Sequence, residues 1–189
     1  MILLIDNYDS FVFNVEQYLK EMTDEQVKTV RNDKITLEEI KKLNPSKIIL
    51  SPGPKHPKDS GICLEILKNI DDTPILGICL GHQAIGYAFG GEIKQLEVPL
   101  HGKTSEIIVN KEDSLLFKEL PKKFSVMHYH SLYVNEDNLP EELEVSAKSD
   151  DGIIMALEHK TKDIYGIQFH PESFFTEYGK KIIKNFVVS

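Results

Sequence analysis

The chain has 189 residues, of which 41% are hydrophobic, and it carries a formal net charge of -8. This length and apolar content suit one ordinary domain, so we expect a single domain over residues 1–189. The charge is spread along the chain with no cluster of Lys or Arg, which argues against a nucleic-acid partner. Asp6 ends the short apolar N-terminus, and no apolar run approaches the roughly 18 residues of a membrane span, so we expect a cytoplasmic protein that does not contact a membrane.

The first half of the chain alternates short β-rich runs with helical patterns. We expect strands over residues 2–5, 27–31, 47–50 and 74–78, and helices over residues 10–21, 36–43 and 62–70. This alternation is typical of βαβ units and predicts a parallel sheet. Thr36 begins a capping-box pattern, and Cys63 lies among apolar residues at helical spacing, so we expect Cys63 in a helix core. In a chain with only two cysteines, Cys63 and Cys79 are expected as reduced thiols.

The second half has a different pattern after Gly90-Gly91. Short alternating strands are expected over residues 92–95, 105–109, 124–128, 132–134, 144–149 and 153–158, followed by a buried strand over 164–169 and a closing helix over 177–187. Alternation of this kind indicates antiparallel strands with one solvated face. The sequence therefore predicts an α/β fold with a mainly parallel central sheet and added antiparallel strands.

Cys79 occupies the turn between a predicted strand and the helical stretch that follows it. Gly77 and Gly81, two residues to either side, allow a tight bend and leave room beside the sulfur. Free N–H groups at the start of the helix would favour a thiolate. A cysteine that simply packs in the core is the plain alternative. The local spacing alone fits a lipase-like hydrolase, a peptidase or a glutaminase.

His170 and Glu172 offer the partners that a cysteine nucleophile needs. Such a nucleophile requires a base, and the base requires a group that orients its ring. Pro171 keeps the backbone extended, so the two side chains are expected on the same side. Because ligands bind at the carboxyl ends of parallel strands, we expect His170 to meet Cys79 there. A surface histidine before a proline turn is the alternative.

The segment Ser51-Pro52-Gly53-Pro54 follows a third predicted strand. Two prolines around one glycine make a stiff loop whose free N–H groups could face a developing oxyanion. The N–H of Gly53 would then pair with that of Leu80, the residue after the nucleophile. Taken by itself, the segment is only a rigid turn.

Together these motifs resemble those of the class-I, triad-type glutamine amidotransferases. The motifs are Gly77-Ile78-Cys79-Leu80-Gly81-His82-Gln83, the 51–54 loop and His170-Pro171-Glu172. Asp6-Asn7-Tyr8-Asp9-Ser10-Phe11, His101-Gly102-Lys103 and Tyr129-His130-Ser131-Leu132 resemble the glutaminase component (component II) of anthranilate synthase and of aminodeoxychorismate synthase. The resemblance spans nearly the whole chain. It implies a flavodoxin-like three-layer sandwich, L-glutamine as substrate, no cofactor in this subunit, and a heteromer with a chorismate-binding synthase subunit.

The resemblance also implies a role for each matching residue. Cys79 would be the nucleophile, His170 the acid and base, and Glu172 the group that orients it. The N–H groups of Gly53 and Leu80 would hold the oxyanion. Glutamine would be held by Gly53, Pro54, Lys55, Gln83, Ser131 and Leu132. Ammonia released from glutamine would pass to the synthase subunit, which makes anthranilate for tryptophan or 4-amino-4-deoxychorismate for folate.

Several alternatives stay open at this point. The chain could be a catalytically silent scaffold subunit, or a free-standing γ-glutamyl hydrolase. Gln83 could be a solvated helix residue. His128 and His130 face one way on a strand, and with no third ligand in sight we expect no metal site. Residues 7–10 and 101–103 could form the surface that contacts the partner, or be loop structure only.

Lys55 departs from the family pattern, in which a second glycine usually follows the residue at Pro54. If the backbone here requires a positive φ, lysine costs about 1 kcal/mol or more. The loop then either carries this strain or bends differently, which affects the expected contact with glutamine.

Overall fold

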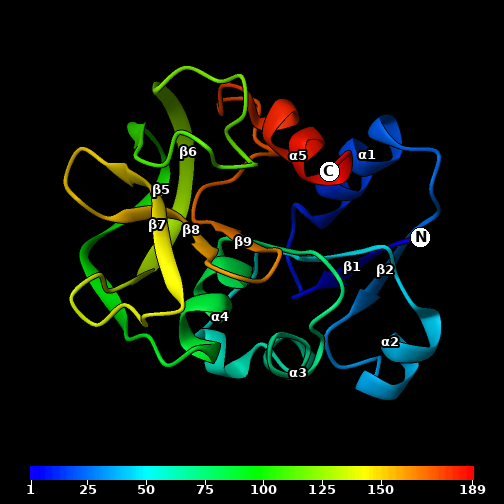
Figure 1. Ribbon diagram of the computed structural model, residues 1–189. Helices are drawn as coiled ribbons and strands as arrows, with labels where there is room; N and C mark the ends of the chain where they lie inside the picture. Colours follow the sequence, from blue (N-terminus) through cyan, green and yellow to red (C-terminus); the bar gives the residue numbers. More distant parts are fainter.

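One sheet of nine strands forms the frame of the molecule, and the structure, a computed structural model, describes residues 1–189 (Figure 1). The strands are β1 (Ile2–Asp6), β2 (Val27–Arg31), β3 (Lys47–Leu50), β4 (Ile75–Ile78), β5 (Ile93–Val109), β6 (Lys123–Val134), β7 (Leu143–Ser149), β8 (Ile154–His159) and β9 (Ile164–Ile167). The helices are α1 (Val12–Met22), α2 (Leu37–Leu43), α3 (Ile62–Asn69), α4 (Leu80–Ala88) and α5 (Gly179–Val187), with a 3₁₀ turn η1 at Pro57–Asp59. The strand order is β2-β1-β3-β4-β9-β8-β7-β5-β6.

The first five strands in this order, from β2 to β9, are parallel and lie between two layers of helices. Helices α1 and α5 cover one face, and α2, α3 and α4 cover the other (Figure 1). Strands β1, β3 and β4 are buried along their whole length, as expected for parallel strands covered on both faces. The predicted α/β, flavodoxin-like three-layer fold is confirmed. None of the helices has the length and apolar content needed to cross a bilayer.

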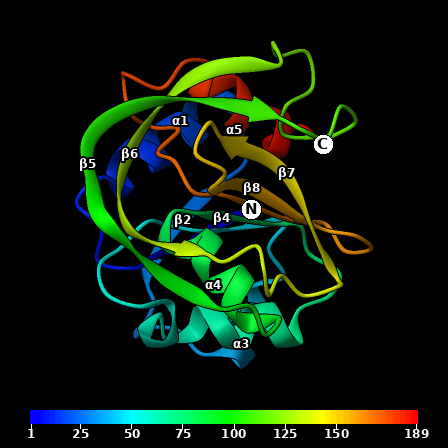
Figure 2. The same cartoon turned by 90° about the vertical axis from the view of Figure 1, so that its left-hand side faces the viewer.

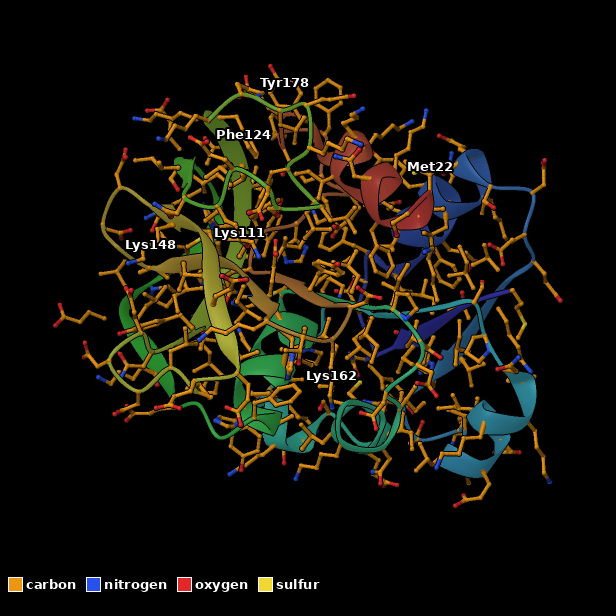
Figure 3. The ribbon with its side chains drawn as sticks, in the orientation of Figure 1. Met22, Lys111, Phe124, Lys148, Lys162 and Tyr178 are labelled. Carbon is orange, nitrogen blue, oxygen red and sulfur yellow. The ribbon has the colours of Figure 1, made fainter.

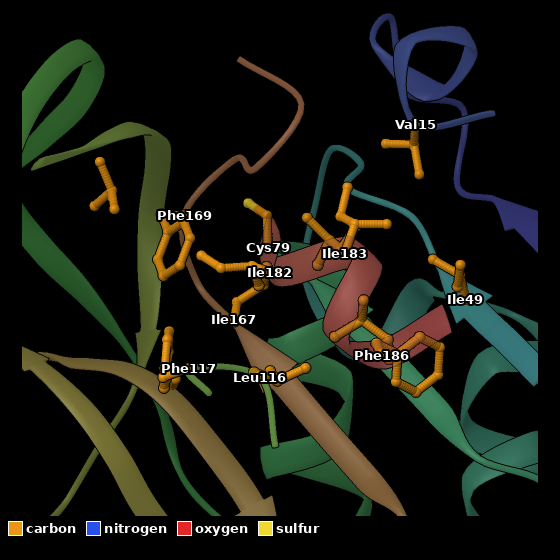
Figure 4. Packing of buried hydrophobic residues seen from close by; sticks show 14 of the residues in the cluster. Val15, Ile49, Cys79, Leu116, Phe117, Ile167, Phe169, Ile182, Ile183 and Phe186 are labelled. Atoms are coloured by element: carbon orange, nitrogen blue, oxygen red, sulfur yellow. The ribbon is translucent and has the colours of Figure 1, made fainter. Parts of the chain in front are cut away.

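Two hydrophobic clusters, one on each side of the sheet, form the core. On the first side, Ile182, Ile183 and Phe186 of α5 pack with Val15 of α1, and Cys79 stands in the same cluster (Figure 4). On the second side, Cys63 of α3 is fully buried, which confirms its prediction as a helix core residue. Both cysteines are free thiols.

The predicted capping box at the start of α2 is also confirmed. The backbone N–H of Glu39 donates to Thr36 Oγ1 over 3.3 Å, and Glu39 Oε2 accepts from the backbone N–H of Thr36 over 2.8 Å. These bonds satisfy two of the N–H groups that a helix start leaves without partners. A seven-residue helix needs such support because short helices are marginal alone.

The antiparallel strands β8, β7, β5 and β6 extend the sheet beyond β9. The prediction of four separate short strands over 92–95, 105–109, 124–128 and 132–134 was wrong. The first two runs belong to β5 and the last two to β6. β5 has 17 residues and β6 has 12, and the pair curves around one side of the molecule (Figure 2). The strand prediction failed at Pro99 and Gly102, which suggest breaks, but β5 absorbs them in two register shifts.

Lys111, in the segment after β5, forms ion pairs with carboxylates of β7 and β8. Lys111, which is labelled in Figure 3, places its Nζ 3.1 Å from Glu158 Oε2 and also pairs with Glu144. Ser114 donates to Glu158. Although burial opposes the charge, the two carboxylates raise the pKa of Lys111 above its ordinary value. Glu158 is buried, and each of its carboxylate oxygens has a partner, Oε1 in Ser114 and Oε2 in Lys111.

Candidate active site

Cys79 forms a sharp elbow between β4 and α4. Its backbone has φ 51° and ψ -99°, a strained conformation for a residue with a side chain, and it is the N-cap of α4. A Cβ on Gly77 would lie 2.4 Å from the carbonyl carbon of Gly81, and one on Gly81 would lie 2.4 Å from the carbonyl oxygen of Leu50. The two glycines therefore let strand, turn and helix approach closely, as the sequence predicted.

His170 and Glu172 lie just beyond β9, the strand next to β4. His170 Nδ1 and Glu172 Oε1 are 2.6 Å apart, and both residues are buried. The backbone is held by the hydroxyl of Thr176, which donates to the carbonyl oxygen of His170 over 2.6 Å. The two side chains therefore project to the same side and the carboxylate fixes the imidazole ring, in the arrangement expected from the sequence.

The surroundings of His170 favour its charged form. Burial opposes the charge, but Cys79 and Glu172 outweigh it and raise the pKa of His170 well above its ordinary value. The rings of Tyr129 and Phe11 flank the imidazole edge-on, with centroids 5.2 Å and 6.2 Å away. Nε2 is buried without a hydrogen-bond partner, so it is free to exchange a proton with a group in the cavity beside Cys79.

Gln168 is a residue of this site that the sequence analysis missed. It is fully buried, and its Nε2 donates to Cys79 Sγ over 3.7 Å. Its Oε1 accepts a hydrogen bond of 3.2 Å from Gln83 Nε2. The only signal in the sequence was a polar residue inside a predicted buried strand, two positions before His170. A donor aimed at the sulfur stabilises negative charge there.

The loop after β3 lies against the elbow. A Cβ on Gly53 would lie 2.9 Å from Leu80 Cδ2, so the two residues expected to form the oxyanion hole are in close contact. Lys55 has φ 72°, so the position does require a positive φ and the expected strain is present. Lys55 is exposed and still borders the cavity beside Cys79.

Two cavities meet at Cys79. One, of about 200 Å³, is bordered by all six residues expected to hold glutamine: Gly53, Pro54, Lys55, Gln83, Ser131 and Leu132. Gln83 is buried and donates to the carbonyl oxygen of Leu132 over 2.8 Å, so it is not a solvated helix residue. The other, of about 370 Å³, lies between the 8–11 loop, the 52–54 segment, Tyr129 and His170. Cys79 therefore borders both cavities.

A chain of hydrogen bonds runs along β6 behind the first cavity. His130 Nδ1 donates to the carbonyl oxygen of Leu132 over 3.0 Å, so its Nε2 is the acceptor, 3.3 Å from His128 Nδ1. His128 Nε2 in turn accepts from the hydroxyl of Ser105 over 2.7 Å. Burial lowers the pKa of each histidine to about 4, which keeps both rings neutral. No group of three or more His, Cys, Asp or Glu side chains is arranged to hold a metal ion.

The two segments considered for partner contact differ from each other. Asn7 is 3% exposed and belongs to the interior, whereas Tyr8, Ser10 and Phe11 are exposed. Residues 101–103 are exposed and form part of β5, so the loop interpretation of that segment was wrong. The strand continues there because β6 pairs with it on either side of a register shift.

This arrangement is suited to acyl transfer through a covalent intermediate. It combines a thiol at a helix N-terminus, an imidazole held by a carboxylate, and backbone N–H groups at the turn. The cavity beside the sulfur has room for a small, polar substrate.

Comparisons with known proteins agree with this chemistry. The sequence profile described as glutamine amidotransferase class-I matches residues 3–189. Anthranilate synthase component 2 of Pyropia yezoensis is 50% identical over 99% of this chain and 98% of its own length, and that of Methanocaldococcus jannaschii is 49% identical over 100% and 96%. The bifunctional protein TrpGD of Thermotoga maritima is 50% identical over 98% of this chain. The matched part is only 32% of the length of that protein. A crystal structure from Thermoplasma acidophilum, provisionally assigned to one subunit of a GMP synthase, has a TM-score of 0.86 and 31% identity, with coverage of 99% of this chain and 92% of that one.

Proposed function

This chain belongs to the class-I glutamine amidotransferase family, and on that premise we propose that it is the glutaminase subunit of an anthranilate synthase. The observation that carries the proposal is the meeting of Cys79 and His170 at neighbouring strand ends, where both border one cavity of about 370 Å³ and His170 pairs with Glu172. The full-length relatives named anthranilate synthase component 2 support the choice of synthase.

The first half of the proposed reaction forms a covalent intermediate. Cys79 transfers its proton to His170 Nε2, and the thiolate attacks the carbon of the glutamine side-chain carboxamide. The N–H groups of Gly53 and Leu80 stabilise the oxyanion. His170 returns the proton to the amide nitrogen, the C–N bond breaks, and ammonia leaves a γ-glutamyl thioester on Cys79. Glu172 keeps the imidazole in the orientation for both transfers.

The second half releases glutamate. His170 takes a proton from water, whose oxygen attacks the thioester carbon, and the same oxyanion site stabilises the second tetrahedral intermediate. When the C–S bond breaks, His170 returns that proton to the Cys79 sulfur, glutamate leaves, and the thiol and the neutral imidazole are restored. Every step uses groups of this chain, so we propose that the subunit needs no cofactor.

Ammonia is useful only if it reaches an acceptor, so we propose a heteromer with a chorismate-using synthase subunit. Two neighbouring phenylalanines beyond the catalytic pair support an interface on this side, because Phe174 is 92% and Phe175 is 62% exposed. A cytoplasmic location is part of the proposal and is supported by the two free thiols, which suit a reducing compartment.

The decisive experiment compares glutamine with ammonia as nitrogen source. In the complex with the synthase subunit, Cys79→Ala should abolish glutamine-dependent product formation and leave ammonia-dependent synthesis intact. Cys63→Ser is the matched control, since burial raises the pKa of that thiol to about 12 and keeps it unreactive. The serine hydroxyl keeps a donor for Asn7 Oδ1, which accepts from Cys63 Sγ over 3.2 Å. Glutamine use that survives in Cys79→Ala would overturn the assignment.

The same complex separates the remaining alternatives. A silent scaffold would support ammonia-dependent synthesis only, even with Cys79 present. A free-standing γ-glutamyl hydrolase would turn over glutamine at full rate without any synthase subunit. The aminobenzoate isomer produced distinguishes tryptophan from folate synthesis, and we expect anthranilate.

A further inference from the structure

Asn7 ties the ends of two neighbouring parallel strands together. It follows β1 directly, and its backbone N–H donates to Ser51 Oγ over 2.9 Å. Its side-chain Nδ2 donates to the carbonyl oxygen of Ser51 over 2.8 Å. Ser51 follows β3 and begins the loop that contains Gly53. The start of this loop is thus held from the side by two hydrogen bonds from one residue.

The orientation of the Asn7 amide is fixed by its other neighbours. Its Oδ1 accepts from Asn32 Nδ2 over 3.0 Å and from Cys63 Sγ over 3.2 Å. Turning the amide over would place Oδ1 against the carbonyl oxygen of Ser51 and Nδ2 against the Asn32 donor. Both contacts would be unfavourable in a buried place. Asn7 therefore has one stable orientation, in which it donates to the loop.

Asn7 also touches the residue on which the oxyanion site depends. A Cβ on Gly53 would lie 2.6 Å from both the Cβ and the carbonyl oxygen of Asn7, and 2.9 Å from Leu80 Cδ2. Gly53 is thus packed closely against both Asn7 and Leu80, with no room for a side chain. The hydroxyl of Ser51 donates to the carbonyl oxygen of Pro52 over 2.7 Å, which stiffens the approach to Gly53.

We propose that Asn7 is a positioning residue that holds the Gly53 N–H in place for the oxyanion. This inference rests on the proposed function, which assigns that N–H to the oxyanion site. Preorganised donors act because they need not reorient as charge develops, and a displacement of about 1 Å can cost about 100-fold in rate. Asn7 itself borders neither of the two cavities at Cys79. Its effect passes through Ser51 and Gly53.

Two measurements separate this role from a merely structural one. Transition-state stabilisation by the oxyanion site affects kcat, whereas glutamine affinity also depends on Gln83 and Leu132, which lie on other elements. Alkylation of Cys79 by iodoacetamide needs the thiolate but forms no oxyanion. Loss of Asn7 should therefore lower glutamine hydrolysis and leave alkylation unchanged.

The experiment compares Asn7→Ala with Asn185→Ala, each in complex with the synthase subunit. Asn185 is a matched control, because it is a buried asparagine whose Nδ2 donates to the carbonyl oxygens of Leu116 and Lys118 over 3.0 Å and 2.9 Å. None of these three residues borders either cavity at Cys79. We expect Asn7→Ala to lower kcat for glutamine by at least about tenfold, with KM and the rate of Cys79 alkylation changed by less than about threefold. In Asn185→Ala, kcat, KM and the rate of Cys79 alkylation should all stay unchanged.

A folded Asn7→Ala protein with unchanged kcat would overturn the proposal, and so would an equal fall in alkylation, which indicates general collapse of the site. If Asn7→Ala does not fold, Ser51→Ala removes one of the two bonds and should lower kcat by a smaller factor, again with KM nearly constant. Unchanged kcat in that variant would overturn the proposal as well. Cys79→Ala tests the proposed function separately, since glutamine use in that variant would refute the function whatever Asn7 does.

Discussion

The parallel strands β3, β4 and β9 end at the site, whereas the antiparallel strand β6 passes alongside it. From the strand ends come Gly53, Cys79 and His170, each in a loop or turn directly after a strand. From the side of β6 come the carbonyl oxygen of Leu132, which accepts from Gln83, and the ring of Tyr129 against the imidazole.

The difference follows from how each kind of strand exposes its atoms. A parallel strand that is covered on both faces can offer polar groups only where it ends, so reactive side chains gather there at tight turns. A long strand at the edge of a sheet exposes one row of its backbone groups along its length. We therefore expect substitutions of Asn7, Cys79 and His170 at the strand ends to act chiefly on kcat, and substitutions along β6 to act chiefly on glutamine binding.

The largest effect should come from His170→Ala. Without the acid and base, kcat for glutamine in the complex should fall by about 10³-fold or more, while ammonia-dependent synthesis stays intact. Steady-state assays with glutamine and with ammonia as nitrogen source measure the two activities separately. A loss of ammonia-dependent synthesis in this variant would show that the change damages the interface rather than the chemistry.

The second effect concerns stability where the two parts of the sheet join. His82 of α4 packs against Gly166 of β9, and complete burial lowers its pKa to about 3. The unfolded chain binds a proton at His82 below about pH 6.5, but the folded chain does not until about pH 3, so stability falls as the pH falls through this window. Urea unfolding at several pH values between 6 and 4 measures how the free energy of unfolding changes with pH. In His82→Gln, this change should be smaller than in the unmodified protein by up to about 1.4 kcal/mol per pH unit. Equal slopes in the two proteins would contradict the buried, neutral state of His82.

A smaller effect is expected along β6. His130→Leu removes the donor to the carbonyl oxygen of Leu132, so KM for glutamine should rise by about tenfold with a lesser change in kcat. His130→Asn places an amide donor close to the position of Nδ1 and should recover part of the affinity. If His130→Leu changes kcat alone, β6 does not act mainly through glutamine binding, and the contrast with the ends of the parallel strands fails.

The smallest effect should come from Lys55→Gly. Glycine adopts the positive φ at this position without strain, so the substitution should raise the free energy of unfolding by up to about 1 kcal/mol. Lys58, a lysine without a positive φ in η1, is the matched control, and Lys58→Gly should lower stability instead. Urea midpoints measure both. If Lys55→Gly also leaves KM unchanged, the lysine side chain does not contact glutamine.

The sequence by itself determined most of the parallel part of the molecule. Its strands and helices, the capping box at Thr36 and the elbow at Cys79 depend on neighbours within a few residues, so local spacing predicted them. The pairing of His170 with Glu172 was predictable for the same reason, since both lie in one extended segment. Even the meeting of Cys79 with His170 followed from a rule about strand ends in parallel sheets.

Only the tertiary structure decided the features that depend on distant segments. Pairing between β5 and β6 joined runs that the sequence separates, because bulges can absorb a proline and a glycine when a neighbouring strand supplies hydrogen bonds. The roles of Gln168 and Asn7 emerged in the same way, from partners 89 and 44 residues away along the chain. A single sequence can mark such a residue as unusual, as the polar Gln168 in a buried strand shows, but it does not reveal the partner, because the contact forms only when the fold brings the two residues together.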